Sequence, residues 1–161
     1  MRILTILSIL LLSACGFSPM YSANNNTSVV SQFNKIEVSI IPDRSGQYLR
    51  NALIDRLYQK GYPTSPTYKL SIEPITENIF DFDITQEAEA TRQQIKLTTQ
   101  MLLTDMQTRK NILTRQLTAV TSNNILESEF STIVTERSAR EAALNDIARQ
   151  IERQLSLYFS K

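Results

Sequence analysis

Residues 92–105, RQQIKLTTQMLLTD, are the longest alternating stretch of the chain and set its fold class. Apolar residues and one Thr occupy every second position, whereas the positions between them are mostly polar. The two sets are Ile95, Leu97, Thr99, Met101 and Leu103 on one side, and Lys96, Thr98, Gln100, Leu102 and Thr104 on the other. Successive side chains of a strand point to opposite faces of a sheet, so this period of two predicts a long strand with one buried face.

The neighbouring segments predict strands that pair with this one. Residues 106–110 are typical of a turn, and residues 112–121, rich in Thr, Leu and Val, form the return strand of a hairpin. On the N-terminal side, residues 68–73 and 80–84 alternate in the same way. We expect these two pieces to be one strand interrupted by a bulge near Pro74, because proline cannot donate a ladder hydrogen bond.

A strand and a helix precede these segments. Residues 35–41 alternate, with Ile36, Val38 and Ile40 on one face, and Pro42 ends the strand. Residues 45–60 carry leucines at helical spacing, which predicts an amphipathic helix with Gly61 at its C-terminal cap position.

A second helix is predicted at the C-terminus, over residues 135–158. Ser138-Ala139-Arg140-Glu141 fits a capping box, but Thr135 is an alternative cap and the helix could begin as early as Ser131. The order β-α-β-β-β-α predicts an α+β fold, a two-layer sandwich of a mostly antiparallel four-stranded sheet packed against two helices.

The first residues predict export and lipid attachment. Arg2 is followed by an apolar stretch that is too short to span a bilayer, and Leu12-Ser13-Ala14-Cys15 resembles a bacterial lipobox. Cys15 is also the only cysteine. We interpret residues 1–14 as a signal peptide, Cys15 as the lipidated residue, residues 15–33 as a polar tether, and residues 34–161 as a single α+β domain. The alternative is a stray free cysteine.

Charge and composition exclude several classes of function. Removal of residues 1–14 lowers Lys+Arg from 17 to 16 against 16 Asp+Glu, whereas a nucleic-acid binder is expected to be clearly basic. The chain has no His, so nucleophile pairs with His and zinc sites built from His and Cys are excluded. The acidic stretch at residues 81–92 has Gln86 and Arg92 where a calcium loop needs Gly and Glu. These absences remove most hydrolase classes, whereas a glycosidase-type pair of carboxylates stays open. We predict no metal or other cofactor.

Basic residues near the hairpin are the candidate binding residues. Arg92 and Lys96 are expected on the outward face of the long strand, Arg109 and Lys110 at the hairpin tip, and Arg115 on the return strand. Together they could line one edge of the sheet and bind phosphate or carboxylate groups of a lipid head group. The alternative is ordinary surface charge that keeps sheet edges from aggregating.

Two segments resemble the LPS-assembly lipoprotein family LptE, particularly its alphaproteobacterial form. Residues 15–21, CGFSPMY, are similar to the family's CGF-x-P-[LM]-Y start, and residues 41–51, IPDRSGQYLRN, to its I-P-[DE]-R-x-[GS]-Q-x-[LF]-R-N segment. Arg140, Ala142, Asp146 and Ile151 fit the family's last helix, whereas Ser22 replaces a family Gly in the tether.

This resemblance implies a two-layer α+β fold and a non-catalytic outer-membrane lipoprotein on the periplasmic side. Such a protein acts as plug and assembly partner of the β-barrel LptD, and it binds lipopolysaccharide (LPS) during insertion into the outer leaflet. Gly16, in place of the Asp that retains lipoproteins at the inner membrane, favours the same location. The alternative is a periplasmic lipoprotein that pilots or scaffolds another envelope complex without a lipid ligand.

Overall fold

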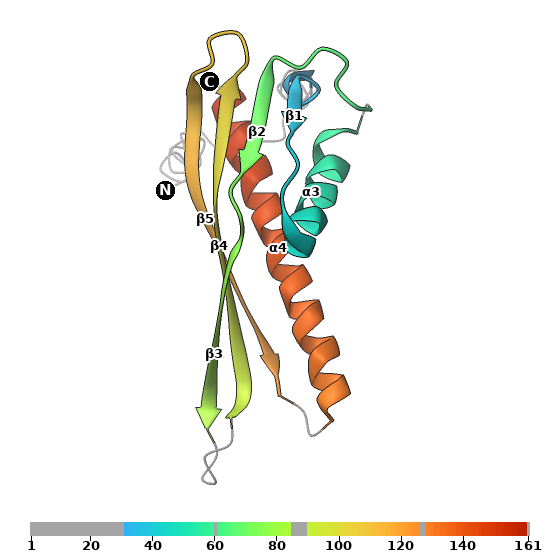
Figure 1. Cartoon of the computed structure of the whole chain (residues 1–161), viewed down its shortest axis with the longest axis vertical. Coiled ribbons are helices and arrows are strands. Elements are labelled where there is room, and N and C mark those ends of the chain that lie inside the picture. The colour runs from blue at the N-terminus through green and yellow to red at the C-terminus, as the bar shows by residue number, and fades with distance from the viewer. Residues whose placement is uncertain (1–30, 60, 85–89, 126–127, 161) are drawn as a thin grey trace, which may run out of the picture.

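A computed structural model describes residues 31–59, 61–84, 90–125 and 128–160 (Figure 1). The predicted signal peptide, Cys15 and most of the predicted tether lie outside these residues. In chain order the elements are β1 (Ile36–Val38), α3 (Asp43–Leu57), β2 (Tyr68–Ile72), β3 (Thr76–Ile84), β4 (Ala90–Asp105), β5 (Asn111–Asn124) and α4 (Glu129–Phe159). The predicted α+β sandwich is confirmed.

Strand β4 is the central strand of the sheet and pairs with β2, β3 and β5. Antiparallel β5 follows it from Arg92 opposite Asn124 to Thr104 opposite Asn111. On the other edge, β2 pairs with the C-terminal part of β4 and β3 with its N-terminal part, both antiparallel, while β1 adds to β2 in parallel. Within the described residues the sheet thus has five strands and not the four predicted, because the strand expected to be interrupted near Pro74 is divided into β2 and β3, which share one edge of β4.

The interruption between β2 and β3 is stabilised by a buried threonine. Pro74 has no N–H to donate, so the ladder breaks beside it. The Thr99 hydroxyl donates a hydrogen bond of 2.7 Å to the Glu73 carbonyl, and the Glu73 N–H donates one of 2.9 Å to the Gln100 carbonyl. Thr99 is therefore buried without an unsatisfied hydroxyl, on the apolar face that the sequence pattern predicted.

Both helices lie on one face of the sheet. The five predicted inward side chains of β4 are buried, and they form one core with residues such as Leu49 and Leu53 of α3 and Ile147 and Ile151 of α4. Phe33, at the end of the predicted tether, is 5% exposed and belongs to this core. Neither helix of the described part has the length and hydropathy that a membrane crossing requires.

The two helices cover different lengths of the sheet (Figure 1). Helix α4 has 31 residues, about 46 Å at 1.5 Å per residue, and runs along most of the molecule. Helix α3 has 15 residues and lies beside β1 and β2, so the first turns of α4 and most of β3 extend beyond it. Only α4 covers the sheet there, within the described residues.

The boundaries of α3 and β1 differ from the sequence expectation. Helix α3 begins at Asp43 and ends at Leu57, not at residues 45 and 60, and Gly61 is not its cap. Tyr58 leaves the helix because its hydroxyl binds β1, and Gly61, with φ of 100°, forms the following turn through a bond to the Tyr58 carbonyl. Strand β1 ends at Val38, so Ile40 is 86% exposed and Ile41 takes the buried position.

Helix α4 begins at Glu129, so the predicted start at Thr135 and the earlier alternative at Ser131 are both too late. Ser128 is its N-cap, and the predicted capping box at Ser138 lies inside the helix. The buried periodicity begins only at Ala139, whereas the apolar residues of the first turns are exposed. The first turns of α4 therefore lack the regular series of buried apolar residues by which a helix start is predicted from sequence.

Candidate functional site

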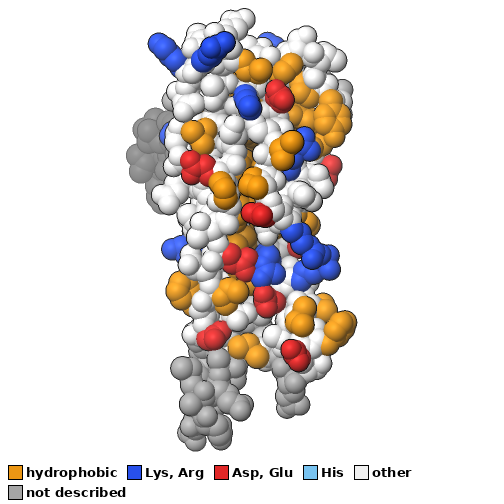
Figure 2. All heavy atoms as spheres, in the orientation of Figure 1, with side chains coloured by type: hydrophobic (Ala, Val, Ile, Leu, Met, Phe, Trp, Pro, Cys, Tyr) orange, Lys and Arg blue, Asp and Glu red, His pale blue; other side chains and the backbone are white. Residues whose placement is uncertain are grey.

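The tip of the β4–β5 hairpin presents two cations on a well-defined turn. The Asp105 carboxylate accepts the backbone N–H groups of Gln107 (2.9 Å) and Thr108 (2.8 Å), and these bonds, first the one from Thr108, lower the pKa of Asp105. Arg109 has φ of 58° and donates its N–H to the Asp105 carbonyl. Arg109 and Lys110 are exposed, and Figure 2 shows basic side chains gathered at this end of the molecule.

The other predicted cations lie elsewhere. Arg92 and Lys96 are on β4, and Arg92 is separated from the turn by roughly 40 Å of strand at about 3.3 Å per residue. Lys96 points to the face opposite the helices, because its neighbours Ile95 and Leu97 are buried. The structure therefore brings Arg109 and Lys110 together and places Arg92 near the opposite end of the sheet.

Arg115 lies on the other face of the sheet from Lys96. It pairs with Met101, which is buried on the helix side, and directly opposed residues in a ladder share a face. Arg115 also lies two residues from Leu113 and from Leu117, which are both buried, so the alternation of β5 places it on the helix side. A bulge lies closer to the turn, where Leu103 pairs with Leu113 but Thr104 pairs with Asn111.

The face of the sheet away from the helices is largely polar. Thr98 pairs with Thr118, Gln100 with Gln116 and Leu102 with Thr114, all on this face. Lys69 and Lys96 add positive charge, and Val120 is an exposed apolar residue among them. No helix or strand of the described part covers this face.

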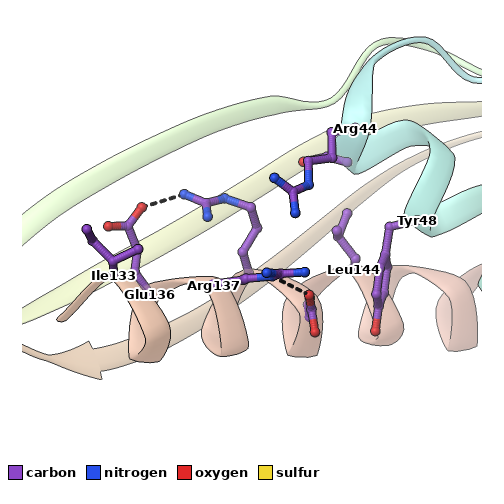
Figure 3. Close-up of a pocket in the computed structure, with 9 residues that line it drawn as sticks. Arg44, Tyr48, Ile133, Glu136, Arg137 and Leu144 are labelled. Atoms are coloured by element: carbon purple, nitrogen blue, oxygen red, sulfur yellow. Dashed lines mark hydrogen bonds and ion pairs between the residues drawn. The ribbon is translucent and has the colours of Figure 1, made fainter. Parts of the chain in front are cut away.

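A cavity of about 220 Å³ lies between the start of α3 and the first half of α4 (Figure 3). Three arginines and two glutamates are among its lining residues, Arg44, Arg137, Arg140, Glu136 and Glu141, with Tyr48, Ile133 and Leu144 as apolar walls. We name it the α3–α4 cavity. Sequence reasoning did not find it, because its walls come from segments about 90 residues apart and no local pattern links them.

Arg140 is the most strongly held of these arginines. It donates two hydrogen bonds of 2.7 Å to the Glu77 carboxylate of β3 and a further one to Glu136. These bonds, above all those to Glu77, raise the pKa of Arg140. Nearby, Arg137 pairs with Glu141 at 3.1 Å, and Asn145 donates to the Tyr48 hydroxyl at 2.9 Å. Within the described residues no cluster of three or more His, Cys, Asp or Glu could hold a metal.

Comparison with known families settles the relationship of the chain. The family described as LptE, lipopolysaccharide-assembly, matches residues 33–156. This range contains strands β1 to β5, helix α3 and most of helix α4. The chain belongs to the LptE family. No curated protein matches the sequence.

Solved structures share the LptE-family fold seen here. A protein from Caulobacter crescentus described as a lipoprotein has a TM-score of 0.64 at 18% identity, over 83% of this chain and 96% of that one. A minor lipoprotein from Acinetobacter baumannii has a TM-score of 0.63 at 22% identity, over 78% and 92%. The rare lipoprotein B of Shewanella oneidensis has a TM-score of 0.60 at 5% identity, over 77% and 93%. At these identities the likeness concerns the fold.

The structure gives a physical reason for one LptE-family motif residue. Gly46, in the IPDRSGQ segment, lies in the first turns of α3, and a Cβ there would come within 2.7 Å of Ile41 Cγ2. Ile41 is 1% exposed, so it has little room to move. Because glycine has no Cβ, the first turns of α3 can pack directly against Ile41, and both Gly46 and Ile41 are buried.

Proposed function

We propose that this LptE-family chain is an outer-membrane lipoprotein that serves as plug and assembly partner of the LptD barrel. In this role it binds LPS during its insertion into the outer leaflet, and it catalyses no reaction. The observation that carries the proposal is the family match over residues 33–156, which covers nearly the whole described body.

The anchor belongs to the same proposal. Residues 1–14 are removed as a signal peptide, Cys15 carries the lipid, and residues 15–33 link it to the domain of residues 34–161. Several acyl chains on one cysteine hold a protein to a membrane stably, since one chain alone is marginal. Mass spectrometry of the mature N-terminus tests this, and an unmodified Cys15 would remove the basis for the location.

The open face of the sheet supports the role as plug. The lumen of an outer-membrane barrel is polar, so a body that fills it needs a polar and hydrated surface. The threonines and glutamines of β4 and β5 provide such a face, and no helix of the described part covers it. We therefore propose that this face lies against the barrel wall.

The hairpin tip supports the role in LPS binding. Arg109 and Lys110 stand side by side on a turn that Asp105 organises, and guanidinium and ammonium groups bind phosphate well. We keep as predicted LPS contacts the three remaining cations, Arg92, Lys96 and Arg115. They lie away from the hairpin tip, so they would have to bind other groups of LPS than the tip does.

Two measurements test the proposal. A tagged, lipidated chain purified from detergent-solubilised outer membrane is expected to bring down a large barrel protein and LPS, and the absence of both would overturn it. For the tip, Arg109→Glu with Lys110→Glu should weaken LPS binding by about tenfold if two phosphate contacts are lost. Arg149→Glu with Arg153→Glu, on the exposed side of α4, changes the net charge equally and should leave LPS binding unchanged.

A further inference from the structure

The described chain begins beside the hairpin tip. Thr67 joins the two places, because its N–H donates to the Lys35 carbonyl at 2.8 Å and its carbonyl accepts the Met106 N–H at 2.9 Å. Phe33 is buried in the core, so the first described residues are fixed to the domain. In Figure 1 the blue start of the described chain and the connection between β4 and β5 both lie at the top. The segment that leads back to Cys15 therefore joins the domain next to the hairpin tip.

The predicted tether is short compared with the body of the protein. Residues 16–30 separate Cys15 from Ser31. An unstructured polar segment of 15 residues spans about 20 Å on average and about 50 Å at most. Helix α4 alone is about 46 Å long. A lipid on Cys15 thus favours an arrangement in which the hairpin-tip end, and not the opposite end, lies near the membrane.

The hairpin-tip end has a positive net charge in the described part of the chain. Strands β1 and β2 and the β4–β5 turn carry four exposed cations there, Lys35, Lys69, Arg109 and Lys110. They carry two acids: Glu37 lies opposite Lys69 in the ladder, and Asp105 accepts two N–H groups of the turn. Residues 51–57 of α3 and 152–159 of α4 each add one acid and one base, which cancel. Four cations against two acids leave a net charge of +2.

The opposite end of the described body has a negative net charge. It comprises β3, residues 90–98 of β4 that pair with β3, and residues 129–141 of α4. These segments carry six acids and four bases, a net charge of −2. The negative surface of a membrane attracts basic segments and repels acidic ones. The charges therefore orient the domain in the same sense as the anchor.

Exposed apolar side chains accompany the cations at the hairpin-tip end. Met106 is 42% exposed beside the turn, and Tyr62 is 69% exposed in the connection after α3. The ring of Tyr62 lies 5.1 Å from that of Tyr58, whose hydroxyl binds β1. Tyrosine rings and the long side chains of Lys and Arg are typical of membrane–water interfaces, since each has an apolar body and a polar end. Figure 2 shows basic side chains at the top of the molecule, with apolar ones nearby.

We infer that the hairpin-tip end lies on the anionic phospholipid surface of the leaflet that holds the lipid of Cys15. The cations of this end bind phosphate groups, and Met106 and Tyr62 enter the headgroup region. The inference rests on the lipid anchor of the proposed function but not on the barrel or on LPS. Arg109 and Lys110 are also the proposed LPS contacts, so the test uses vesicles without LPS.

Fluorescence quenching by a spin-labelled lipid tests which end meets the membrane. The full-length lipidated chain is inserted into vesicles of phosphatidylcholine, phosphatidylglycerol and a lipid that is spin-labelled at its headgroup. Because Cys15 is the only native cysteine and carries the lipid, Gln107→Cys or Ser122→Cys supplies the single free thiol for a fluorophore. Both positions are exposed, and Ser122 lies roughly 35 Å of strand away from the turn. The probe at residue 107 should be quenched about fivefold more, since surface contacts act within about 10 Å.

Charge variants separate contact by the tip from mere proximity through the tether. Arg109→Glu with Lys110→Glu should lower the quenching at residue 107 about threefold, and Gln at both positions should give an intermediate value. Arg44→Glu with Arg149→Glu changes the net charge equally at exposed positions of the two helices and should leave the quenching unchanged.

Mass spectrometry of the vesicle-bound chain separates failure of the anchor from failure of the inference. If Cys15 is acylated but residues 107 and 122 are quenched equally, the inference is overturned and the anchor stands. Quenching at residue 107 that is insensitive to charge reversal at the tip has the same consequence. An unmodified Cys15 would overturn the anchor and the inference together.

Discussion

Arg140 of α4 donates two parallel hydrogen bonds to Glu77 of β3, each 2.7 Å long, across 63 residues of sequence. The pair joins the helix to the sheet at a level that α3 does not cover. Both side chains are about three-quarters buried, at 26% and 25% exposure, so solvent weakens the bonds little. Arg140 therefore fixes how the first half of α4 lies against β3.

Arg140→Ala should lower the free energy of unfolding by about 1–3 kcal/mol, because it leaves the Glu77 carboxylate partly buried without its partner. Arg140→Lys should recover only part of this, since an ammonium group cannot form both bonds in the same plane. Denaturant unfolding measures the change. Arg137→Ala is the control: its pair with Glu141 is 63% exposed on the arginine side, and its loss should change stability by less than about 0.5 kcal/mol. Equal effects of the two alanine variants would contradict the assigned role.

Gly46→Ala should destabilise the protein in spite of the better helix propensity of alanine. The added Cβ would meet Ile41 Cγ2 at 2.7 Å and the Ile41 backbone at 3.0 Å. Overpacking of this kind costs about 1–3 kcal/mol, which exceeds the gain of about 1 kcal/mol from helix propensity. Thermal unfolding of Gly46→Ala, with Gln47→Ala as the exposed neighbour control, decides this, and a stabilised Gly46→Ala would show that the helix can shift away.

Tyr58→Phe should loosen the contact between α3 and β1. The Tyr58 hydroxyl accepts the Val38 N–H at 2.9 Å and donates to the Ile36 carbonyl at 3.0 Å. Removing it leaves two partly buried backbone groups without these bonds, which should cost about 1–2 kcal/mol in denaturant unfolding. Tyr62→Phe is the matched control, since Tyr62 is 69% exposed. A Tyr58→Phe variant as stable as the control would show that water replaces the hydroxyl.

Asp146 should make stability depend on pH at the acid end. A hydrogen bond from the Gln150 side chain, followed by the bond from Arg149, lowers the pKa of Asp146 from its ordinary value of 3.8. A depressed pKa stabilises the fold above about pH 3.8, and this contribution is lost as the pH falls through the folded-state value. The stability advantage of the native chain over Asp146→Asn should therefore shrink below about pH 4 in urea unfolding. A constant difference across that range would exclude the linkage.

The sequence predicted the sheet better than the ends of its helices. Within residues 92–105, Ile95, Leu97 and Met101 can be buried on one face only if the segment is a strand. The structure confirms both the strand and its buried face. The start of α4 was missed because Phe130 and Ile133 are apolar but exposed, and no buried period marks the helix before Ala139. The end of α3 was missed because Tyr58 is held by a strand that precedes the helix.

The candidate site was predictable only where it is local. Arg109 and Lys110 are neighbours on one turn, so any hairpin brings them together. Arg115 lies two residues from Leu113 and from Leu117, which are both buried, so the alternation of β5 places it on the helix side, away from Lys96. The α3–α4 cavity depends on how α3 packs against α4, and the spacing of residues within either helix does not reveal this packing.

The uneven cover of β4 implies that one continuous strand has two levels of protection against local opening. Near Met101 and Leu103 its inner face is buried beneath both helices, whereas near Ile95 α4 is the one described helix that lies over the sheet. Free energies of local opening follow the buried apolar contacts around each amide. In amide hydrogen exchange, the N-terminal amides of β4 should therefore exchange before its C-terminal ones. The strand would then fray from its N-terminal end while the hairpin tip stays ordered, so the two ends of the molecule differ in stiffness.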